Sequence, residues 1–302
     1  MYSTLCFSFF LSHAILQGQK AGHNLSSEKT FERLDSMLDM TYASYEGRTL
    51  KLDLYKPREK LGHLPAIVCI HGGGWAKGSR KNYTKVAQAL ATHGYVAVTI
   101  SYRLSGEAVF PAAIVDCKAA VRFLRAHAET LGINSDKIGA IGSSAGGHLA
   151  ALLATSYGAE ELEGSGGYAT FSSQIQAVVP MAAQTDFLSA RNRQVSGERL
   201  IWKQFMGGTQ EEKPDAYQLA SPIEHLNFGD PPCFLISGEM DDESTRGAKF
   251  RKRMNQLGIS SELEIIEGAP HGFLKEQAWF KQAMEAAVAH FNRVLKGFSV
   301  SK

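Results

Sequence analysis

Gly142-Ser143-Ser144-Ala145-Gly146 sets a serine between two glycines, directly after the apolar run at residues 138–141. That run is short enough for a buried strand, and residues 147–154 have the composition of a helix. A strand that turns abruptly into a helix at Gly-x-Ser-x-Gly is the pattern of a nucleophile elbow. The glycines are needed because the strand and the helix come too close together for Cβ atoms. The turn leaves the serine hydroxyl at a helix N-terminus, where outward-pointing N–H groups favour negative charge.

Strand-like apolar runs alternate with helical patterns along the rest of the chain. The other strand-like runs lie at residues 50–54, 66–70, 96–100, 177–181, 234–237 and 263–266. The helical patterns lie at residues 83–93, 112–127, 145–156, 245–257 and 280–294. Such alternation is typical of a mostly parallel sheet with helices on both faces. Because crossover connections are right-handed, we predict the α/β class with a doubly wound sheet.

Two segments interrupt this alternation, and each follows a late strand. Residues 158–173 are glycine-rich and polar, which predicts a loop. Residues 187–221 are long and mixed in composition, with a short helix expected around Trp202. Parallel sheets carry their sites at this edge, so we predict that residues 187–221 form a small lid-like insertion over a pocket. The alternative is a surface insertion that has no role at the pocket.

The first residues differ in composition from the rest of the 302-residue chain. Residues 5–16 are mostly apolar, and the first charged residue is Lys20. This resembles the apolar region of a secretory signal peptide, and a disordered leader is the alternative. The run is too short to span a membrane. We predict a leader at residues 1–23 and a single catalytic domain at residues 24–302. The mature form would be secreted or periplasmic without stable membrane insertion, or cytoplasmic if the leader is no signal.

Charge and cysteine content argue against several classes of partner. The chain has 32 basic and 30 acidic residues, with a formal charge of +2. No long run of one sign occurs, so neither nucleic acid nor an anionic membrane is an expected partner. The cysteines outside the leader, Cys69, Cys117 and Cys233, have no paired spacing. We therefore expect neither a disulfide framework nor a metal site.

A second glycine-rich motif, His71-Gly72-Gly73-Gly74-Trp75, follows the strand-like run at residues 66–70. Three glycines free several backbone N–H groups to converge on one point, as a tetrahedral oxyanion requires. A phosphate loop would need Lys after its last glycine, whereas Gly78 is followed by Ser79-Arg80. No dinucleotide fingerprint follows the first strands either. We therefore expect an oxyanion-binding loop and no organic cofactor.

His271 stands between Pro270 and Gly272, just after the last strand-like run. These neighbours place it on a loop, and an imidazole there can take the proton of a serine hydroxyl near neutral pH. Among the other histidines, His148 follows the elbow on the helix, where a packing role is expected. His271 is therefore the candidate base for Ser144.

Carboxylates are crowded into the loop at residues 238–243, after another strand-like run. One of them would orient the imidazole and stabilise its charged form. Asp241 is the first choice, with Asp242 and then Glu239 as alternatives. The order serine, aspartate, histidine along the chain is the one expected of an α/β-hydrolase.

Taken together, the motifs resemble the α/β-hydrolase serine esterases. Within these, the chain is similar to the bifunctional feruloyl and acetyl-xylan esterase-like group, which is related to hormone-sensitive-lipase-type carboxylesterases. The motifs that carry the resemblance are HGGGW at 71–75, SYRL at 101–104, FPAAIVDCKAAVRFL at 110–124, GSSAGGHLA at 142–150 and GAPHGF at 268–273. The chain departs from lipase-like relatives at Ser143, where they usually carry Asp.

The resemblance implies a role for each candidate residue. Ser144 matches the nucleophile, His271 the base and Asp241 the acid. The backbone N–H groups of the oxyanion hole match Gly73, Gly74 and Ala145. Trp75 and Trp202 are candidates for the substrate pocket, and Arg103 and Asp116 match structural positions.

The function that this resemblance implies is hydrolysis of carboxylic esters through an acyl-enzyme. The expected substrates are short-acyl esters or carbohydrate-linked acetyl and feruloyl esters, with no cofactor. Two alternatives stay open, namely an amide hydrolase of the formamidase type and a non-catalytic binding protein on the same scaffold.

Overall fold

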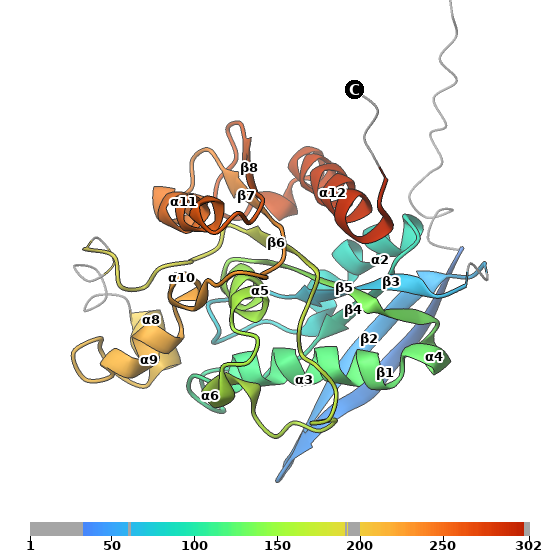
Figure 1. Cartoon of the computed structure of the whole chain (residues 1–302), viewed down its shortest axis with the longest axis horizontal. Coiled ribbons are helices and arrows are strands. Elements are labelled where there is room, and N and C mark those ends of the chain that lie inside the picture. The colour runs from blue at the N-terminus through green and yellow to red at the C-terminus, as the bar shows by residue number, and fades with distance from the viewer. Residues whose placement is uncertain (1–32, 60–61, 191, 193–199, 299–302) are drawn as a thin grey trace, which may run out of the picture.

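The strands of the computed structural model form one eight-stranded sheet in the order β1-β2-β4-β3-β5-β6-β7-β8 (Figure 1). The structure describes residues 33–59, 62–190, 192 and 200–298. All neighbouring strands from β4 to β8 are parallel, whereas β2 is antiparallel to both β1 and β4. The strands are β1 (Leu34–Tyr45), β2 (Arg48–Pro57), β3 (Leu64–Ile70), β4 (Val96–Ile100), β5 (Ile133–Ser143), β6 (Ala177–Met181), β7 (Cys233–Gly238) and β8 (Ser261–Ile266).

Helices cover both faces of this sheet, which confirms the predicted α/β architecture. Helices α2 and α12 lie over one face, and α3 and α5 lie over the other (Figure 1). The described helices are α2 (Thr84–Thr92), α3 (Ala112–Ala126), α4 (Ala128–Leu131), α5 (Ala145–Thr155), α6 (Glu160–Glu163), α8 (Leu200–Met206), α9 (Pro214–Leu219), α10 (Pro222–His225), α11 (Ala248–Gln256) and α12 (Gln277–Phe291). The sheet is fully buried at its centre, which is why strands such as β4 and β6 read as continuous apolar runs.

Strand β1 and helix α6 are among the elements that were not predicted from the sequence. Strand β1 pairs along β2 at the edge of the sheet, and most of its side chains are partly or fully exposed. An edge strand of this kind buries few side chains, so its sequence lacks an apolar run. The predicted loop at residues 158–173 contains the short helix α6. The cysteines outside the leader are free and buried.

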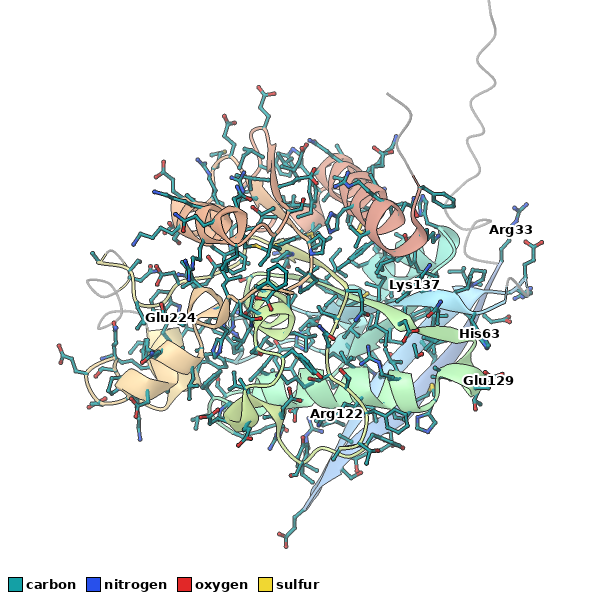
Figure 2. All side chains as sticks on the ribbon, in the orientation of Figure 1. Arg33, His63, Arg122, Glu129, Lys137 and Glu224 are labelled. Atoms are coloured by element: carbon teal, nitrogen blue, oxygen red, sulfur yellow. The ribbon has the colours of Figure 1, made fainter. Side chains whose placement is uncertain are left out.

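The loop that contains α6 is held against helix α3 by polar side chains. The Arg122 guanidinium, labelled in Figure 2, donates to the carbonyl oxygens of Glu163 and Gly167 at 3.0 and 3.1 Å. The buried ammonium of Lys118 lies 2.7 Å from the Glu163 carboxylate. These cations come from successive turns of α3, so a glycine-rich segment is fixed without an apolar core of its own.

A buried ion pair joins the start of α3 to the segment after β4. The Asp116 carboxylate is fully buried and accepts the Arg103 backbone N–H at 2.8 Å and its guanidinium at 2.7 Å. The guanidinium also lies 3.8 Å from the centre of the Tyr45 ring on β1. This pair connects the edge of the sheet to α3, in agreement with the structural role expected for both residues.

An aromatic cluster attaches the long segment between β6 and β7 to the sheet. The Trp75 indole stacks on Phe205 of α8 at 4.4 Å and donates to His148 Nδ1 at 3.1 Å. The other nitrogen of His148, Nε2, donates to the Ala220 carbonyl at 2.7 Å. Both ring nitrogens of this buried histidine are thus used, which gives it the packing role expected from its position.

The predicted leader at residues 1–23 lies outside the described residues. Within the part of the chain that the structure describes, no helix has the length and apolar character needed to cross a membrane.

The Arg103–Asp116 pair yields a stability prediction. We expect Asp116→Asn to lower the free energy of unfolding by about 3 kcal/mol, because Arg103 keeps its charge in a largely buried site without a full counter-charge. Urea denaturation followed by circular dichroism measures this change. The exposed Asp215 offers a control, and Asp215→Asn should change the stability by less than about 0.5 kcal/mol. Equal effects of the two substitutions would contradict the role of the pair.

His148 yields a prediction on pH dependence. Burial lowers the pKa of His148 from 6.5 to about 4, so the unfolded chain takes up its proton at a higher pH than the folded chain. The stability that this neutral imidazole contributes is complete above pH 6.5 and is lost as the pH falls toward 4. Between pH 7 and pH 4.5 this amounts to about 2 kcal/mol.

The measurement compares urea denaturation at those two pH values for the wild type and His148→Asn. We expect a smaller loss on acidification in the variant. The exposed His93 provides a matched control, because His93→Asn should keep the wild-type pH dependence. An unchanged pH dependence in His148→Asn would disprove the assignment.

Candidate active site

Ser144 stands at the corner between β5 and α5, where the chain reverses sharply. Its backbone has φ 55° and ψ −120°, a conformation that non-glycine residues rarely adopt. A Cβ on Gly142 would lie 2.2 Å from the Gly146 carbonyl oxygen, and a Cβ on Gly146 would lie 2.1 Å from that of Ile70. Both glycines are therefore required for the close approach of strand and helix, as the motif predicts. The Ser144 N–H donates to the Met181 carbonyl at 2.8 Å, which fixes the corner to β6.

Ser144, His271 and Asp241 are brought together from the ends of three strands. Nε2 of His271 lies 2.8 Å from the Ser144 Oγ, and Nδ1 lies 2.8 and 2.9 Å from the two Asp241 carboxylate oxygens. With the proton on Nδ1 directed to Asp241, Nε2 is the acceptor of the hydrogen bond from the Ser144 hydroxyl. The Asp241 side chain is 5% exposed and the His271 side chain is 51% exposed. The imidazole thus faces the solvent-accessible site while the carboxylate behind it is shielded.

The alternative carboxylates have other partners. Asp242 accepts the Ser244 backbone N–H at 2.9 Å, where it begins a short 3-10 helix. Glu239 accepts the Gly268 N–H at 2.8 Å and so joins the loops that follow β7 and β8. These contacts stabilise the loops around Asp241, whose carboxylate lies within hydrogen-bond distance of His271 Nδ1.

The glycine-rich loop after β3 passes directly beside the elbow. A Cβ on Gly72 would lie 2.7 Å from the Ser143 carbonyl oxygen. Gly73 and Gly74 have φ values of 117° and 61°, which favour glycine. Their amides donate to no other group of the described residues. Gly74 and Ala145, the first residue of α5, line the same cavity as Ser144.

The residue that starts this loop, His71, is rigidly held. Its ring stacks on Tyr102 at 4.4 Å, and the Tyr102 hydroxyl donates to the His71 carbonyl at 2.9 Å. Its Nδ1 lies 2.7 Å from the Gly72 carbonyl. Burial lowers the pKa of His71, so a neutral ring with Nδ1 as donor fits these contacts. His71 is therefore a buried support of the loop.

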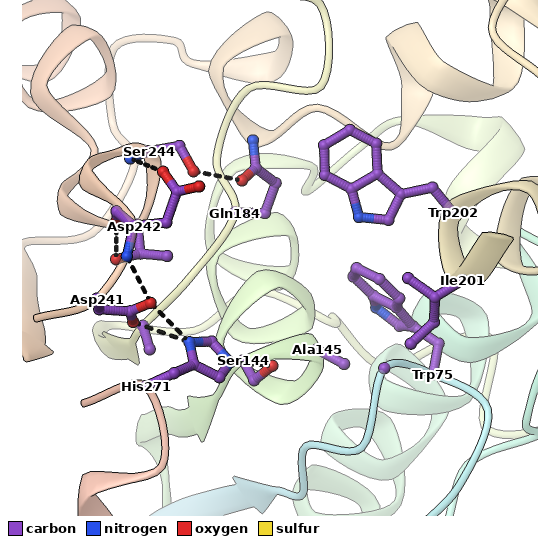
Figure 3. Close-up of a pocket in the computed structure, with 13 residues that line it drawn as sticks. Trp75, Ser144, Ala145, Gln184, Ile201, Trp202, Asp241, Asp242, Ser244 and His271 are labelled. Atoms are coloured by element: carbon purple, nitrogen blue, oxygen red, sulfur yellow. Dashed lines mark hydrogen bonds and ion pairs between the residues drawn. The ribbon is translucent and has the colours of Figure 1, made fainter. Parts of the chain in front are cut away.

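A cavity of about 290 Å³ opens in front of Ser144. Figure 3 shows the serine in its middle, with His271 and Asp241 at one end and Trp75, Trp202 and Ile201 at the other. Trp75 and Trp202 line it as expected, both nearly fully buried.

Several lining residues were missed in the sequence. These include Ile201, Gln184, Asp242 as a pocket residue, Ser244 and Thr245. Gln184 and Ser244 follow β6 and β7 at the edge where parallel sheets carry their sites, and this position is the signal that could have identified them. Ile201 directly precedes Trp202, which was predicted to line the pocket. Which side chains of helix α8 face the cavity depends on how that helix packs, and the sequence does not show this.

The predicted lid segment at residues 187–221 contributes to this cavity through α8. Residues 191 and 193–199 within it lie outside the described residues. Among all the residues that the structure describes, no group of three or more histidine, cysteine or carboxylate side chains is arranged to hold a metal ion.

The chain matches one family model and many known esterases. Residues 52–246 match the BD-FAE family. The chain is 29% identical to the probable carboxylic ester hydrolase LipM of Mycobacterium tuberculosis over 245 residues, which are 76% of this chain but only 55% of LipM. It is 25% identical to an ethyl acetate hydrolase of Pseudomonas putida, with 84% of this chain and 80% of that protein covered.

Solved structures of esterases have the same fold. A truncated carbohydrate esterase from gut microbiota superposes with a TM-score of 0.72 at 26% identity, covering 85% of this chain and 96% of that one. Esterase 2 of Thermogutta terrifontis, solved phosphonylated by cyclosarin, gives 0.69 at 29% identity, covering 82% and 90%. The family model matches more than half of the chain, so the chain belongs to the BD-FAE family. It has the α/β-hydrolase fold of these esterases.

Proposed function

We propose that this protein hydrolyses carboxylic esters through an acyl-enzyme formed on Ser144. The observation that carries the proposal is the unbroken chain of hydrogen bonds from Asp241 through His271 to the Ser144 Oγ, at a cavity. This arrangement has the geometry of a Ser-His-Asp triad. The similarity to esterases from bacteria supports the reaction class.

The reaction proceeds in two halves. His271 Nε2 takes the hydroxyl proton as Ser144 Oγ bonds to the ester carbonyl carbon, and the carbonyl oxygen becomes an oxyanion. The amides of Gly73, Gly74 and Ala145 stabilise that charge, each donor lowering the barrier by about 3–4 kcal/mol. His271 returns the proton to the alcohol as the C–O bond breaks. Water, deprotonated by the same nitrogen, then releases the acid and regenerates Ser144.

Asp241 makes the histidine suitable for both halves. Its carboxylate holds the tautomer with the proton on Nδ1 and stabilises the imidazolium that forms after proton transfer. The carboxylate is shielded from solvent, so its charge acts on His271 at short range.

The cavity favours short acyl groups joined to a polar alcohol. Apolar side chains of Trp75, Trp202 and Ile201 line one end, whereas Gln184, Asp242 and Ser244 line the end near His271 with hydrogen-bonding groups. Carbohydrate-linked acetyl esters fit this division best, and feruloyl esters are the bulkier member of the same class. A carbohydrate esterase and an ethyl acetate hydrolase are among the similar proteins. No cofactor takes part in this mechanism.

The domain organisation is part of the proposal. Residues 24–302 would form one catalytic domain, with residues 187–221 as a cap over the cavity. Residues 1–23 would be a leader that directs the chain out of the cytoplasm if they act as a signal.

Two other functions remain to be tested against this one. The same triad could hydrolyse an amide, as formamidases do, and a binding protein could keep the scaffold without activity. A panel of acetylated xylan, methyl ferulate, p-nitrophenyl esters of increasing chain length and N-formylkynurenine separates them. We expect the acetyl esters to react fastest. A preference for N-formylkynurenine would favour the amide hydrolase, and no turnover at all would favour the binding protein.

Replacing the nucleophile tests the acyl-enzyme directly. Ser144→Ala should lower kcat on p-nitrophenyl acetate by about 10⁴ or more, because the substitution removes the hydroxyl that forms the acyl-enzyme. A serine-directed phosphonate should add its mass to the Ser144 peptide of the wild type and to no peptide of the variant. Ser143→Ala, one residue away, is the matched control for the label. Retention of most activity in Ser144→Ala would disprove the proposal.

The identity of the acid is tested by two neighbouring substitutions. Asp241→Asn should lower kcat by about 10³–10⁴, because an amide stabilises the wrong tautomer of His271 and not its charged form. Asp242→Asn keeps an oxygen acceptor for the Ser244 N–H and should lower kcat less than about tenfold. Steady-state kinetics on p-nitrophenyl acetate measures both. A larger loss in Asp242→Asn than in Asp241→Asn would transfer the role to Asp242.

A further inference from the structure

The geometry of the candidate site fixes which end of the cavity receives the acyl group. The ester carbonyl oxygen must face the amides of Gly73, Gly74 and Ala145, and the departing alcohol oxygen must reach His271 Nε2 to be protonated. The acyl chain therefore points away from His271. Figure 3 shows that this direction leads to Trp75, Trp202 and Ile201.

Ile201 lies in direct contact with the oxyanion loop at this end. A Cβ built on Gly74 would lie 1.9 Å from the Ile201 Cδ1 and 2.9 Å from its Cγ1. The tip of the isoleucine therefore rests on the Gly74 backbone, beside the place where the acyl carbon binds. The side chain lines the cavity and is 38% exposed, so it stands at the boundary between the cavity and the solvent.

The helix that carries Ile201 is held in place by its other face. Trp202 and Phe205 of α8 are 3% and 1% exposed. Phe205 stacks on Trp75 at 4.4 Å with ring planes 13° apart, and its carbonyl accepts the Phe110 N–H at 2.8 Å. The Trp202 ring meets Phe187 edge-on at 5.0 Å. The backbone of Ile201 is thus held in place by the packing of the other face of α8.

We propose that Ile201 determines the length of the acyl chain that the enzyme accepts. Its tip closes the apolar end of the cavity, so acetyl esters fit, and longer unbranched chains meet the isoleucine. Trp75 and Trp202 form the side walls and contribute bulk, whereas Ile201 stands where an extended chain would leave the cavity. The proposal rests on the ester hydrolysis proposed above and names a specificity-determining residue for it.

The test uses p-nitrophenyl acetate, butyrate and hexanoate with the wild type, Ile201→Ala and Leu200→Ala. Leu200 precedes Ile201 on α8, is 77% exposed and does not line the cavity, so it is a matched control. The ratio of kcat/KM for hexanoate to that for acetate should rise at least about tenfold in Ile201→Ala. It should stay within about twofold of the wild type in Leu200→Ala.

A second variant tests the opposite direction. Ile201→Phe fills more of the same end, and we expect it to lower kcat/KM for butyrate at least about tenfold relative to acetate. It also keeps the proposal testable if Ile201→Ala does not fold, which circular dichroism and phosphonate labelling of Ser144 would reveal. A series of acetate esters with different alcohols completes the experiment, and Ile201→Ala should leave their relative rates unchanged.

The outcomes are distinct. An unchanged chain-length ratio in both folded Ile201 variants would overturn the proposal, as would an equal change in Leu200→Ala or a shift in alcohol preference alone. In those cases the wild type would still hydrolyse p-nitrophenyl acetate, and the proposed function would stand. If the wild type hydrolyses none of the esters and takes up no phosphonate, the proposed function itself fails.

Discussion

The backbone of Ser144 depends on a close approach that only glycine permits. Strand β5 and helix α5 meet at an angle that leaves no space for Cβ atoms at Gly142 and Gly146, and α5 also touches the β6 backbone at Gly147. These contacts hold the serine at a positive φ of 55°, a conformation that costs energy and that the surrounding packing must maintain. The strain presents the hydroxyl at the N-terminus of α5 and above the carboxyl edge of the sheet. His271 and the residues that line the cavity lie around the Ser144 hydroxyl.

The parallel strands bring the remaining groups to the same edge. Asp241 and His271 are far from Ser144 in sequence, but the loops after β5, β7 and β8 leave the same edge of the parallel sheet, so the three side chains meet there. The oxyanion loop follows β3 on the other side of β5. The aromatic cluster around Trp75 and His148 then joins this loop to the segment between β6 and β7. One buried cluster therefore connects the glycine-rich loop to the segment that contributes Trp202 and Ile201 to the cavity.

Periodicity predicted most of the fold because buried parallel strands need apolar side chains on both faces. The strands at the centre of the sheet were identified for this reason, and several bounds agree to the residue. Strand β1 was not predicted, because it lies at the edge of the sheet and exposes most of its side chains, so its sequence has no apolar run. Helix α6 was missed because it is only four residues long and is held by Lys118 and Arg122 of α3, which are distant in sequence. Propensity within the segment could not show such contacts.

The amino-acid sequence by itself identified the residues of the candidate site, because a strained serine, a glycine-rich loop and a loop histidine each need particular residues at particular spacings. Gly142, Gly146 and the glycines after His71 are steric requirements that can be read without coordinates. The tertiary structure decided which carboxylate meets His271, since three candidates stand within a few residues and only their loop conformation separates them. It also decided that Ile201 and not Leu200 faces the cavity. That choice depends on how α8 packs its aromatic face on Trp75 and Phe187, which are contacts between residues far apart in the chain.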